Sequence, residues 1–362
     1  MQSTSLRCDH IQGLILGAAI GDALGYARCG LRRRQAIKLF GRVDAKNRFA
    51  RDVAITGFNT SQILMTAQSV VSSGTDVDNF DKSFRRRLGG YSFTLPTDMK
   101  STSRWMGRKS LLHLKKPAKA SQSLSNDCVI RPLLLVLALH NTNLGTRSWT
   151  EHAVTITHDH PLAIEGCHLL AGLTNLIINE RGALNAPAAA NFLSEMECSS
   201  EYVDTLKLLV KSLENERSAV AVARQLGWRG FVPGDIVPTV VMSIYCFLRH
   251  HQDYRRAVLS AIGLGGDTST LGAVVGALSG ARLGVRKIPT ELIKQIPPGH
   301  YGELIEDLSH RLANWPHGAD DLHDAPPLPA SPFTIIQGNL AKWLRLGVHC
   351  ITRKPRTMLV RS

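Results

Sequence analysis

Apolar residues recur along most of the chain at the three-to-four-residue spacing of a helix with one buried face. One such stripe covers positions 63–71, and another covers 304–315. Pro132, Pro161 and Pro238 each begin a long apolar run, and proline is well tolerated in the first turn of a helix. The sequence shows no comparable series of alternating strand segments. The pattern therefore predicts an all-α protein with many helices.

Two apolar segments near opposite ends of the chain carry glycine at every fourth position. The segments "IQGLILGAAIGDALG" and "GDTSTLGAVVGALSGARLG" supply Gly13, Gly17, Gly21 and Gly25, and Gly272, Gly276, Gly280 and Gly284. Each glycine inside a helix costs about 1 kcal/mol relative to alanine, so a full face of them needs a compensating cause. Close approach of two helix backbones is such a cause, because residues four apart lie above one another. We therefore expect these helices to pack face to face; two unrelated core helices rich in small residues are the alternative.

Length and proline content predict how the chain is divided. The 362 residues suffice for one large domain or two ordinary ones, each with a sizeable core. The proline-rich piece "WPHGADDLHDAPPLPASPF" predicts the end of the main domain. We expect a domain at 1–315, a linker at 316–333 and a basic tail at 334–362. The polar and weakly periodic stretch 89–126 predicts a long surface loop with short helices.

Cysteine usage and the apolar runs indicate the compartment. The seven cysteines are scattered and form no CxxC pair, which favours a reducing compartment and argues against a structural zinc site. The apolar run at 11–27 contains Asp22 and four glycines, and no basic segment with a cleavage site precedes it. We therefore expect no targeting signal and no membrane span, and the expected location is the cytoplasm.

The charge balance is strongly basic. The chain has 43 Lys and Arg against 29 Asp and Glu, a formal net charge of +14. Such a surplus attracts polyanions, whether nucleic acid, phosphorylated ligands or acidic membrane. No aromatic interleaving and no nucleic-acid motif accompany the basic runs, so nucleic acid is a partner without motif support. A solvated basic surface explains the same composition.

Polar clusters stand at the starts of several predicted helices. In "GGDTST", Asp267, Ser269 and Thr270 suit helix capping, while Gly265 and Gly266 can adopt left-handed conformations that aim backbone amides at an anion. Phosphate binding and cation binding at Asp267 are both compatible with this turn. The other clusters are "FNTSQ" at 58–62, "SNDCVIR" at 125–131 and "THDHP" at 157–161. Four helix starts of this kind predict that several N-termini converge on one polar site.

These segments carry a family resemblance. "GLILGAAIGDALG", "SNDCVIRP", "THDHPLAIEG" and "GLGGDTSTLGAVVGALSGA" occur in the order found in the ADP-ribosylglycohydrolase family, and the likeness extends over about 11–315. The resemblance implies a compact, multi-helix all-α domain in which the two glycine-bearing helices lie together. It also implies two divalent cations, Mg²⁺ or Mn²⁺, and cleavage of the glycosidic bond that joins ADP-ribose to a modified group.

The family's metal-ligand motifs are degenerate in this sequence. Its Thr-Asp-Asp-Thr turn matches 58–61, where Asn59 and Thr60 replace both carboxylates. Its Asp-x-Asp-Thr turn matches Asp267, Ser269 and Thr270, so one of two carboxylates remains. The family's assisting glutamate falls at Cys29 or its neighbours, where "YARCG" has no acid. Hard dications need anionic oxygen ligands to repay their dehydration, so these positions predict weak or absent metal binding, with any catalytic role limited to Asp267.

The resemblance implies that the parts that contact ADP-ribose are better preserved. Ser125, Asn126, His158 and His160 match the family's ADP-ribose-binding motifs, while Asp127 replaces a glycine there. The leading interpretation is a protein that recognises ADP-ribose or ADP-ribosylated protein and whose dinuclear hydrolysis is impaired or lost. One alternative is an active hydrolase that uses a single cation. The other is an interaction protein that binds polyanions through its basic surface.

Overall fold

The computed structural model describes residues 2–43, 56–92, 120–140, 142–180, 182–294, 296 and 300–316. Within these ranges the chain is helical apart from one short two-stranded ladder, which confirms the predicted all-α class. The helices of the first half are α1 (Gln2–Tyr26), α2 (Arg33–Phe40), α3 (Phe58–Ser73), α4 (Val77–Ser92), α6 (Arg131–Leu139), α7 (Thr146–Thr155) and α8 (Pro161–Asn179). Those of the second half are α9 (Ala186–Ser194), α10 (Ser200–Glu214), α11 (Ala219–Gln225), α12 (Ile236–Arg249), α13 (Tyr254–Ile262), α14 (Thr268–Leu283), the 3₁₀ turn η1 (Val285–Lys287), α15 (Thr290–Ile293) and α16 (His300–Asn314).

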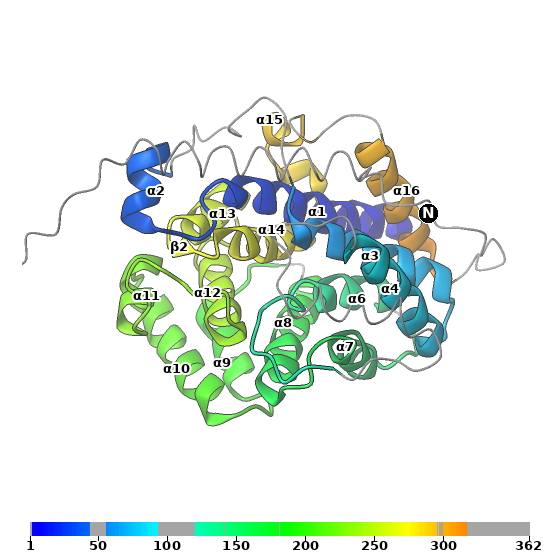
Figure 1. The fold of residues 1–362 in the computed structure, drawn as a ribbon, viewed down its shortest axis with the longest axis horizontal. Helices are drawn as coiled ribbons and strands as arrows, with labels where there is room; N and C mark the ends of the chain where they lie inside the picture. Colours follow the sequence, from blue (N-terminus) through cyan, green and yellow to red (C-terminus); the bar gives the residue numbers. More distant parts are fainter. Residues whose placement is uncertain are drawn as a thin grey trace, which may run out of the picture.

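The two glycine-bearing helices, α1 and α14, pack directly against each other in antiparallel orientation, from Gly13 to Gly25 of α1 (Figure 1). Gly13 lies against Gly280, Gly17 against Gly276, Gly21 against Gly272, and Gly25 against the backbone of Thr268. A side chain at any of these glycines would overlap the backbone of the facing helix. The predicted face-to-face pairing is therefore confirmed, and it brings the N-terminal segment of the chain against the segment at 268–283.

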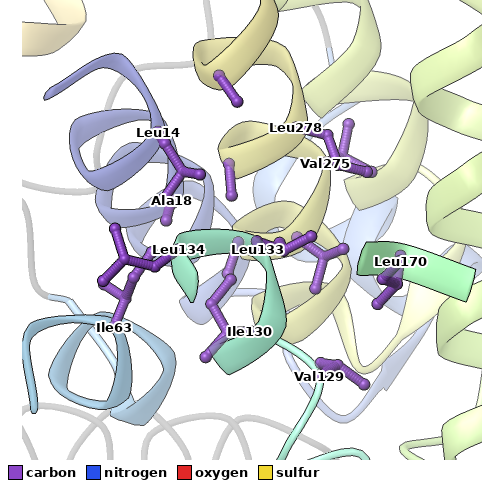
Figure 2. Close-up of a cluster of buried hydrophobic side chains, with 14 of the residues drawn as sticks. Leu14, Ala18, Ile63, Val129, Ile130, Leu133, Leu134, Leu170, Val275 and Leu278 are labelled. Atoms are coloured by element: carbon purple, nitrogen blue, oxygen red, sulfur yellow. The ribbon is translucent and has the colours of Figure 1, made fainter. Parts of the chain in front are cut away.

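The hydrophobic core forms around this helix pair. Figure 2 shows α6 between α3 and α1 on one side and α14 and α8 on the other. Ile63, Leu134 and Leu14 meet on the first side, and Leu133, Val275 and Leu170 on the second; all six are fully buried. Because α6 is apolar around its whole circumference, it can be buried on every face.

Among the residues that the structure describes, one helix, α8, has the length and composition of a membrane span. In α8, half of the apolar window lies buried inside the protein. This helix packs against α6, α7 and α12 and contributes Cys167, Leu170 and Leu173 to the core. Its apolar character is therefore explained by burial among other helices of this chain.

The ladder consists of β1 (Leu31–Arg32) and β2 (Gly265–Gly266), paired antiparallel with Leu31 opposite Gly266. Both glycines adopt the predicted left-handed conformation, with φ of 78° and 85°. A side chain at Gly266 would overlap the backbone of Val232, and one at Gly265 would lie 2.9 Å from the carbonyl oxygen of Gly230. The pair is thus required where the chain turns from α13 into α14.

The predicted surface loop, linker and tail fall largely outside the residues that the structure describes. The predicted surface loop at 89–126 begins later than expected, because α4 continues to Ser92 and buries Phe84, Leu88 and Tyr91 on its inner face. Positions 93–119 of this loop lie outside the described residues. The predicted linker beyond Pro316 and the predicted tail at 334–362 also lie outside them.

Candidate functional site

The positions predicted as metal ligands on α3 and α14 lie beside Asp22 of α1, where these three helices meet. Asp22 comes from the C-terminal half of α1, Asn59 and Thr60 from the first turn of α3, and Ser269 and Thr270 from the first turn of α14. The glycine ladder explains the convergence: since no side chain separates α1 from α14, the first turn of α14 reaches the end of α1. There the hydroxyl of Thr268 donates to the carbonyl oxygen of Gly25 at 2.8 Å.

Asp22 lies at the centre of this arrangement and is completely buried. Its Oδ2 accepts hydrogen bonds from the backbone N–H of Gly57 at 2.8 Å and from Thr60, through the N–H at 3.0 Å and the hydroxyl at 2.7 Å. Its Oδ1 accepts from the hydroxyl of Ser269 and from the Nδ2 of Asn59, the latter at 3.5 Å. Burial raises the pKa of Asp22, and the hydrogen bonds from Ser269 and Thr60 act in the opposite direction.

Asp22 was not among the residues predicted for the site. The signal for it is nevertheless present in the sequence, because Asp22 is the one charged residue in the apolar run at 11–27. A carboxylate in a buried helix needs several hydrogen-bond donors around it, and a polar cluster elsewhere in the chain must supply them. Which cluster supplies them depends on the packing of α3 and α14 against α1.

Asp267 caps the N-terminus of α14 and forms a second carboxylate centre. Its Oδ1 accepts from the backbone N–H of Thr270 at 3.4 Å and from the thiol of Cys29 at 3.4 Å. Its Oδ2 accepts from the Nδ2 of Asn126 at 2.9 Å. The same Nδ2 lies 2.7 Å from the hydroxyl of Thr239 on α12. Asp267 thereby joins the loop before α6 to α12 and α14.

Asn59 connects the two carboxylate centres. Its Nδ2 lies 3.5 Å from the Oδ1 of Asp22 and 3.4 Å from the hydroxyl oxygen of Thr270. The five positions predicted as degenerate metal ligands therefore come together in the structure: Asn59, Thr60, Asp267, Ser269 and Thr270. Their role as ligands stays a prediction.

The residues of this cluster do not fit the pair of divalent cations that the family resemblance implies. Two dications carry four positive charges, whereas the cluster offers the carboxylates of Asp22 and Asp267. The carboxylate of Asp22 already accepts hydrogen bonds from five backbone and side-chain donors, which fill its acceptor capacity, so a cation there would have to displace a donor. The carboxylate of Asp267 accepts from the N–H of Thr270, the thiol of Cys29 and the Nδ2 of Asn126. Within the described ranges no three His, Cys, Asp or Glu side chains gather as a metal site would require. Hydroxyl and amide dipoles repay the dehydration of Mg²⁺ less well than carboxylates do.

Ser125 and His158 form a second part of the candidate site. The hydroxyl of Ser125 lies 2.8 Å from the Nε2 of His158, which is fully buried. The Nδ1 of His158 lies 2.7 Å from the hydroxyl of Thr157, which accepts a hydrogen bond from Arg131 at 2.9 Å. This chain of contacts holds the loop that carries Ser125 and Asn126 against the start of α8.

His160 and Asp127 differ in their local roles. The ring of His160 caps α8 by accepting a hydrogen bond from the N–H of Leu162 at 3.2 Å, and the residue is half-buried. Asp127 is buried, and its carboxylate interacts electrostatically with Arg131. The backbone carbonyl of Asp127 accepts a hydrogen bond from Gln62 of α3. The loop at 125–128 is therefore held from both α3 and α8.

The chain is similar to known proteins in both sequence and fold. A family model described as ADP-ribosylglycohydrolase matches residues 2–321. The ADP-ribosyl-[dinitrogen reductase] glycohydrolase of Rhodospirillum rubrum is 24% identical over 293 residues, which cover 80% of this chain and 90% of that protein. A solved structure described as an ADP-ribosylglycohydrolase-related protein complex aligns with a TM-score of 0.63 and 22% identity, over 85% of this chain and 98% of the other. The last comparison shows that the two chains share a fold.

Proposed function

Because the chain belongs to the ADP-ribosylglycohydrolase family, we propose that it recognises ADP-ribosyl groups at the candidate site and that its dinuclear-metal hydrolysis is impaired or lost. The family is generally metal-dependent and acts on ADP-ribosylated substrates. The observation that carries the proposal is the hydrogen bonding of Asp22, one of the two carboxylates of the cluster, whose oxygens are taken by donors of the protein itself. Without a metal pair, the site lacks the means by which such enzymes activate water.

Recognition does not depend on the same groups. The Oδ1 of Asn126 is buried and has no hydrogen-bond partner among the described residues, although its Nδ2 is bonded to Asp267 and Thr239. A buried acceptor without a donor is costly, and a ligand hydroxyl would supply the donor. Ser125 and Cys29 at the edge of the cluster are half-exposed, so solvent reaches the site from their side. A ribose, which carries several hydroxyl groups, suits this arrangement.

The proposal is tested by calorimetric titration of the full chain with ADP-ribose, with and without Mg²⁺. We expect binding of similar affinity in both conditions and no release of ADP-ribose from ADP-ribosyl-arginine when Mg²⁺ is added. Prompt release would show an active hydrolase. Binding that requires Mg²⁺ would show that the cluster holds a cation after all. Either result would overturn the proposal.

A substitution at Asp267 gives opposite expectations for the two mechanisms. Without a metal, Asp267→Asn removes a negative charge from the candidate site and, because ADP-ribose is an anion, tightens ADP-ribose binding by about 2- to 5-fold. If Asp267 binds a required cation, the same change weakens binding. Asp204→Asn is the matched control, since Asp204 is exposed on α10 and its loss removes the same charge. Equal effects of the two variants would mean that only net charge matters.

The proposal includes a cytoplasmic location and a division of the chain into a domain, a linker and a tail. The cysteines of the described residues are all free, which supports a cytoplasmic location. We take 1–315 as the ADP-ribosylglycohydrolase-like domain, followed by a linker at 316–333 and a basic tail at 334–362. Limited proteolysis that releases a fragment ending near 315 would support this division.

A further inference from the structure

A cavity lies at the end of the molecule where Figure 1 shows α2 and α11. Its volume is about 550 Å³, within the range of small-molecule sites. It is lined by α2, the loop before α11, the C-terminal end of α12, and α13, and it is open to solvent. None of its lining residues belongs to the cluster around Asp22 and Asp267. This cavity is named the arginine cavity below, after the five arginines that line it: Arg28, Arg33, Arg42, Arg217 and Arg249.

The arginine cavity carries a large excess of positive charge. Among its described lining residues the one carboxylate is Glu216, which lies 3.7 Å from Arg249. The side chain of Arg33 donates to the carbonyl oxygen of Gly263 at 2.9 Å. The buried guanidinium of Arg28 donates to the carbonyl oxygens of Phe40 at 3.2 Å and Gly41 at 3.1 Å. These carbonyl groups orient the guanidinium groups and neutralise none of their net charge.

A histidine in the wall is subject to the same positive field. Burial lowers the pKa of His250, and the neighbouring charges of Arg249 and Arg256 lower it further, against the opposing effect of Asp253. His250 is therefore neutral at physiological pH. It offers a hydrogen-bonding ring while the arginines provide the charge.

The remaining wall is apolar. Ile37 of α2, Val220 of α11, and Leu259 and Ile262 of α13 line the cavity beside the arginines. A purely ionic ligand would leave this apolar surface in water. A ligand that combines adjacent anionic groups with a flat or apolar part would cover both.

We propose that the arginine cavity binds a phosphate ester with two or more adjacent phosphate groups attached to a heterocyclic or apolar group, as in a nucleoside triphosphate. The planar fork of an arginine matches phosphate oxygens in pairs, so several arginines around one cavity favour a polyphosphate over a single carboxylate. The volume of about 550 Å³ and the apolar part of the wall favour a small molecule over the backbone of a duplex. The site is independent of ADP-ribosyl recognition.

The test is calorimetric titration of the full chain with ATP, tripolyphosphate and adenosine at low salt. ATP is expected to bind most tightly, tripolyphosphate about 10-fold more weakly, and adenosine not measurably. Arg42→Gln with Arg217→Gln removes two exposed guanidinium groups and is expected to weaken ATP binding by 10-fold or more. Arg147→Gln with Arg286→Gln removes the same charge from exposed positions outside the cavity and serves as the matched control.

A variant expected to tighten ATP binding keeps the test independent of folding defects, because a misfolded protein would not bind more tightly. Glu216→Gln removes the one carboxylate and is expected to tighten ATP binding by about 3-fold. Asp267→Asn, at the candidate site, is expected to leave ATP binding unchanged. ADP-ribose also carries a diphosphate, so its titration is repeated on the Arg42→Gln, Arg217→Gln variant to separate the two sites.

Four outcomes would overturn the proposal. One is an equal loss of ATP binding in the cavity variant and in its matched control. Another is a failure of Glu216→Gln to tighten binding. A third is a change of ATP affinity in Asp267→Asn, in either direction, which would place the nucleotide at the candidate site. The fourth is competition between duplex DNA and ATP for the cavity, with DNA binding that weakens steeply as salt rises. That result would identify a nucleic-acid surface instead.

Discussion

Replacing Gly17 by alanine tests the close packing of α1 and α14. The new Cβ would overlap the carbonyl oxygen of Gly276 and lie 3.0 Å from its carbonyl carbon, well inside the contact distance of about 3.5 to 4 Å. Both groups belong to helix backbone, so they cannot rotate away, and the helices must separate. Separation also lengthens the 2.7 Å hydrogen bond from the hydroxyl of Tyr254 to the carbonyl oxygen of Gly17. Overpacking of this kind costs about 1 to 3 kcal/mol, and loss of the hydrogen bond adds about 1 kcal/mol.

The expected destabilisation is therefore about 3 kcal/mol. With an unfolding entropy of about 2.1 cal/mol/K per residue over the whole chain, this lowers the Tm by about 4 °C. The measurement is thermal unfolding followed by circular dichroism, with urea unfolding as a second probe. Gly90→Ala in α4 is the matched control, because a Cβ there meets nothing within 4 Å. The control is expected to be neutral or stabilising by up to about 1 kcal/mol, and equal stability of the two variants would refute the reasoning.

Two further predictions concern the core and the degenerate metal positions. Burial raises the pKa of the Cys246 thiol from 9.0 to about 12, so only the unfolded chain loses this proton near pH 10.5 and folding becomes less favourable as pH rises from 9. The stability difference between wild type and Cys246→Ala, measured by urea unfolding, should shrink by about 2 kcal/mol between about pH 8 and about pH 10.5; a constant difference would contradict the assigned burial effect. Replacing Asn59, Thr60 and Ser269 together by aspartate should lower the Tm in the absence of metal, and Mg²⁺ should raise it again. When Mg²⁺ is at 100 times its Kd, its binding adds about 2.7 kcal/mol to the free energy of unfolding. Wild type treated with Mg²⁺ is the control, and identical responses would show that the three positions cannot share a cation.

The helical architecture could be predicted from local sequence patterns. Apolar spacing is a property of neighbouring residues, and it indicated helices in the segments that form α3, α6, α8, α12 and α16. The pairing of α1 with α14 was also predictable, although it joins distant parts of the chain. Glycine at every fourth position is costly in a helix unless another backbone lies against it. The two glycine patterns therefore predicted that the helices carrying Gly17 and Gly276 pack against each other.

The candidate site was predictable in part. The convergence of Asn59, Thr60, Ser269 and Thr270 was expected from the polar helix starts and from the family resemblance. The central position of Asp22 was missed, because a single buried carboxylate does not specify which donors surround it. The start of the surface loop was also predicted too early, at Gly89, because Tyr91 and Ser92 continue the buried face of α4 beyond that glycine.

The sequence by itself determined the helices, the partner of α1 and the loss of carboxylates from the metal-ligand motifs, because these depend on residue type and short-range spacing. Only the tertiary structure decided which donors occupy the oxygens of Asp22 and Asp267. The arginine cavity was decided in the same way, since its arginines come from segments far apart in the chain. Such contacts form when packed helices bring together side chains that are far apart in the sequence. A local sequence pattern does not specify which of these side chains will meet.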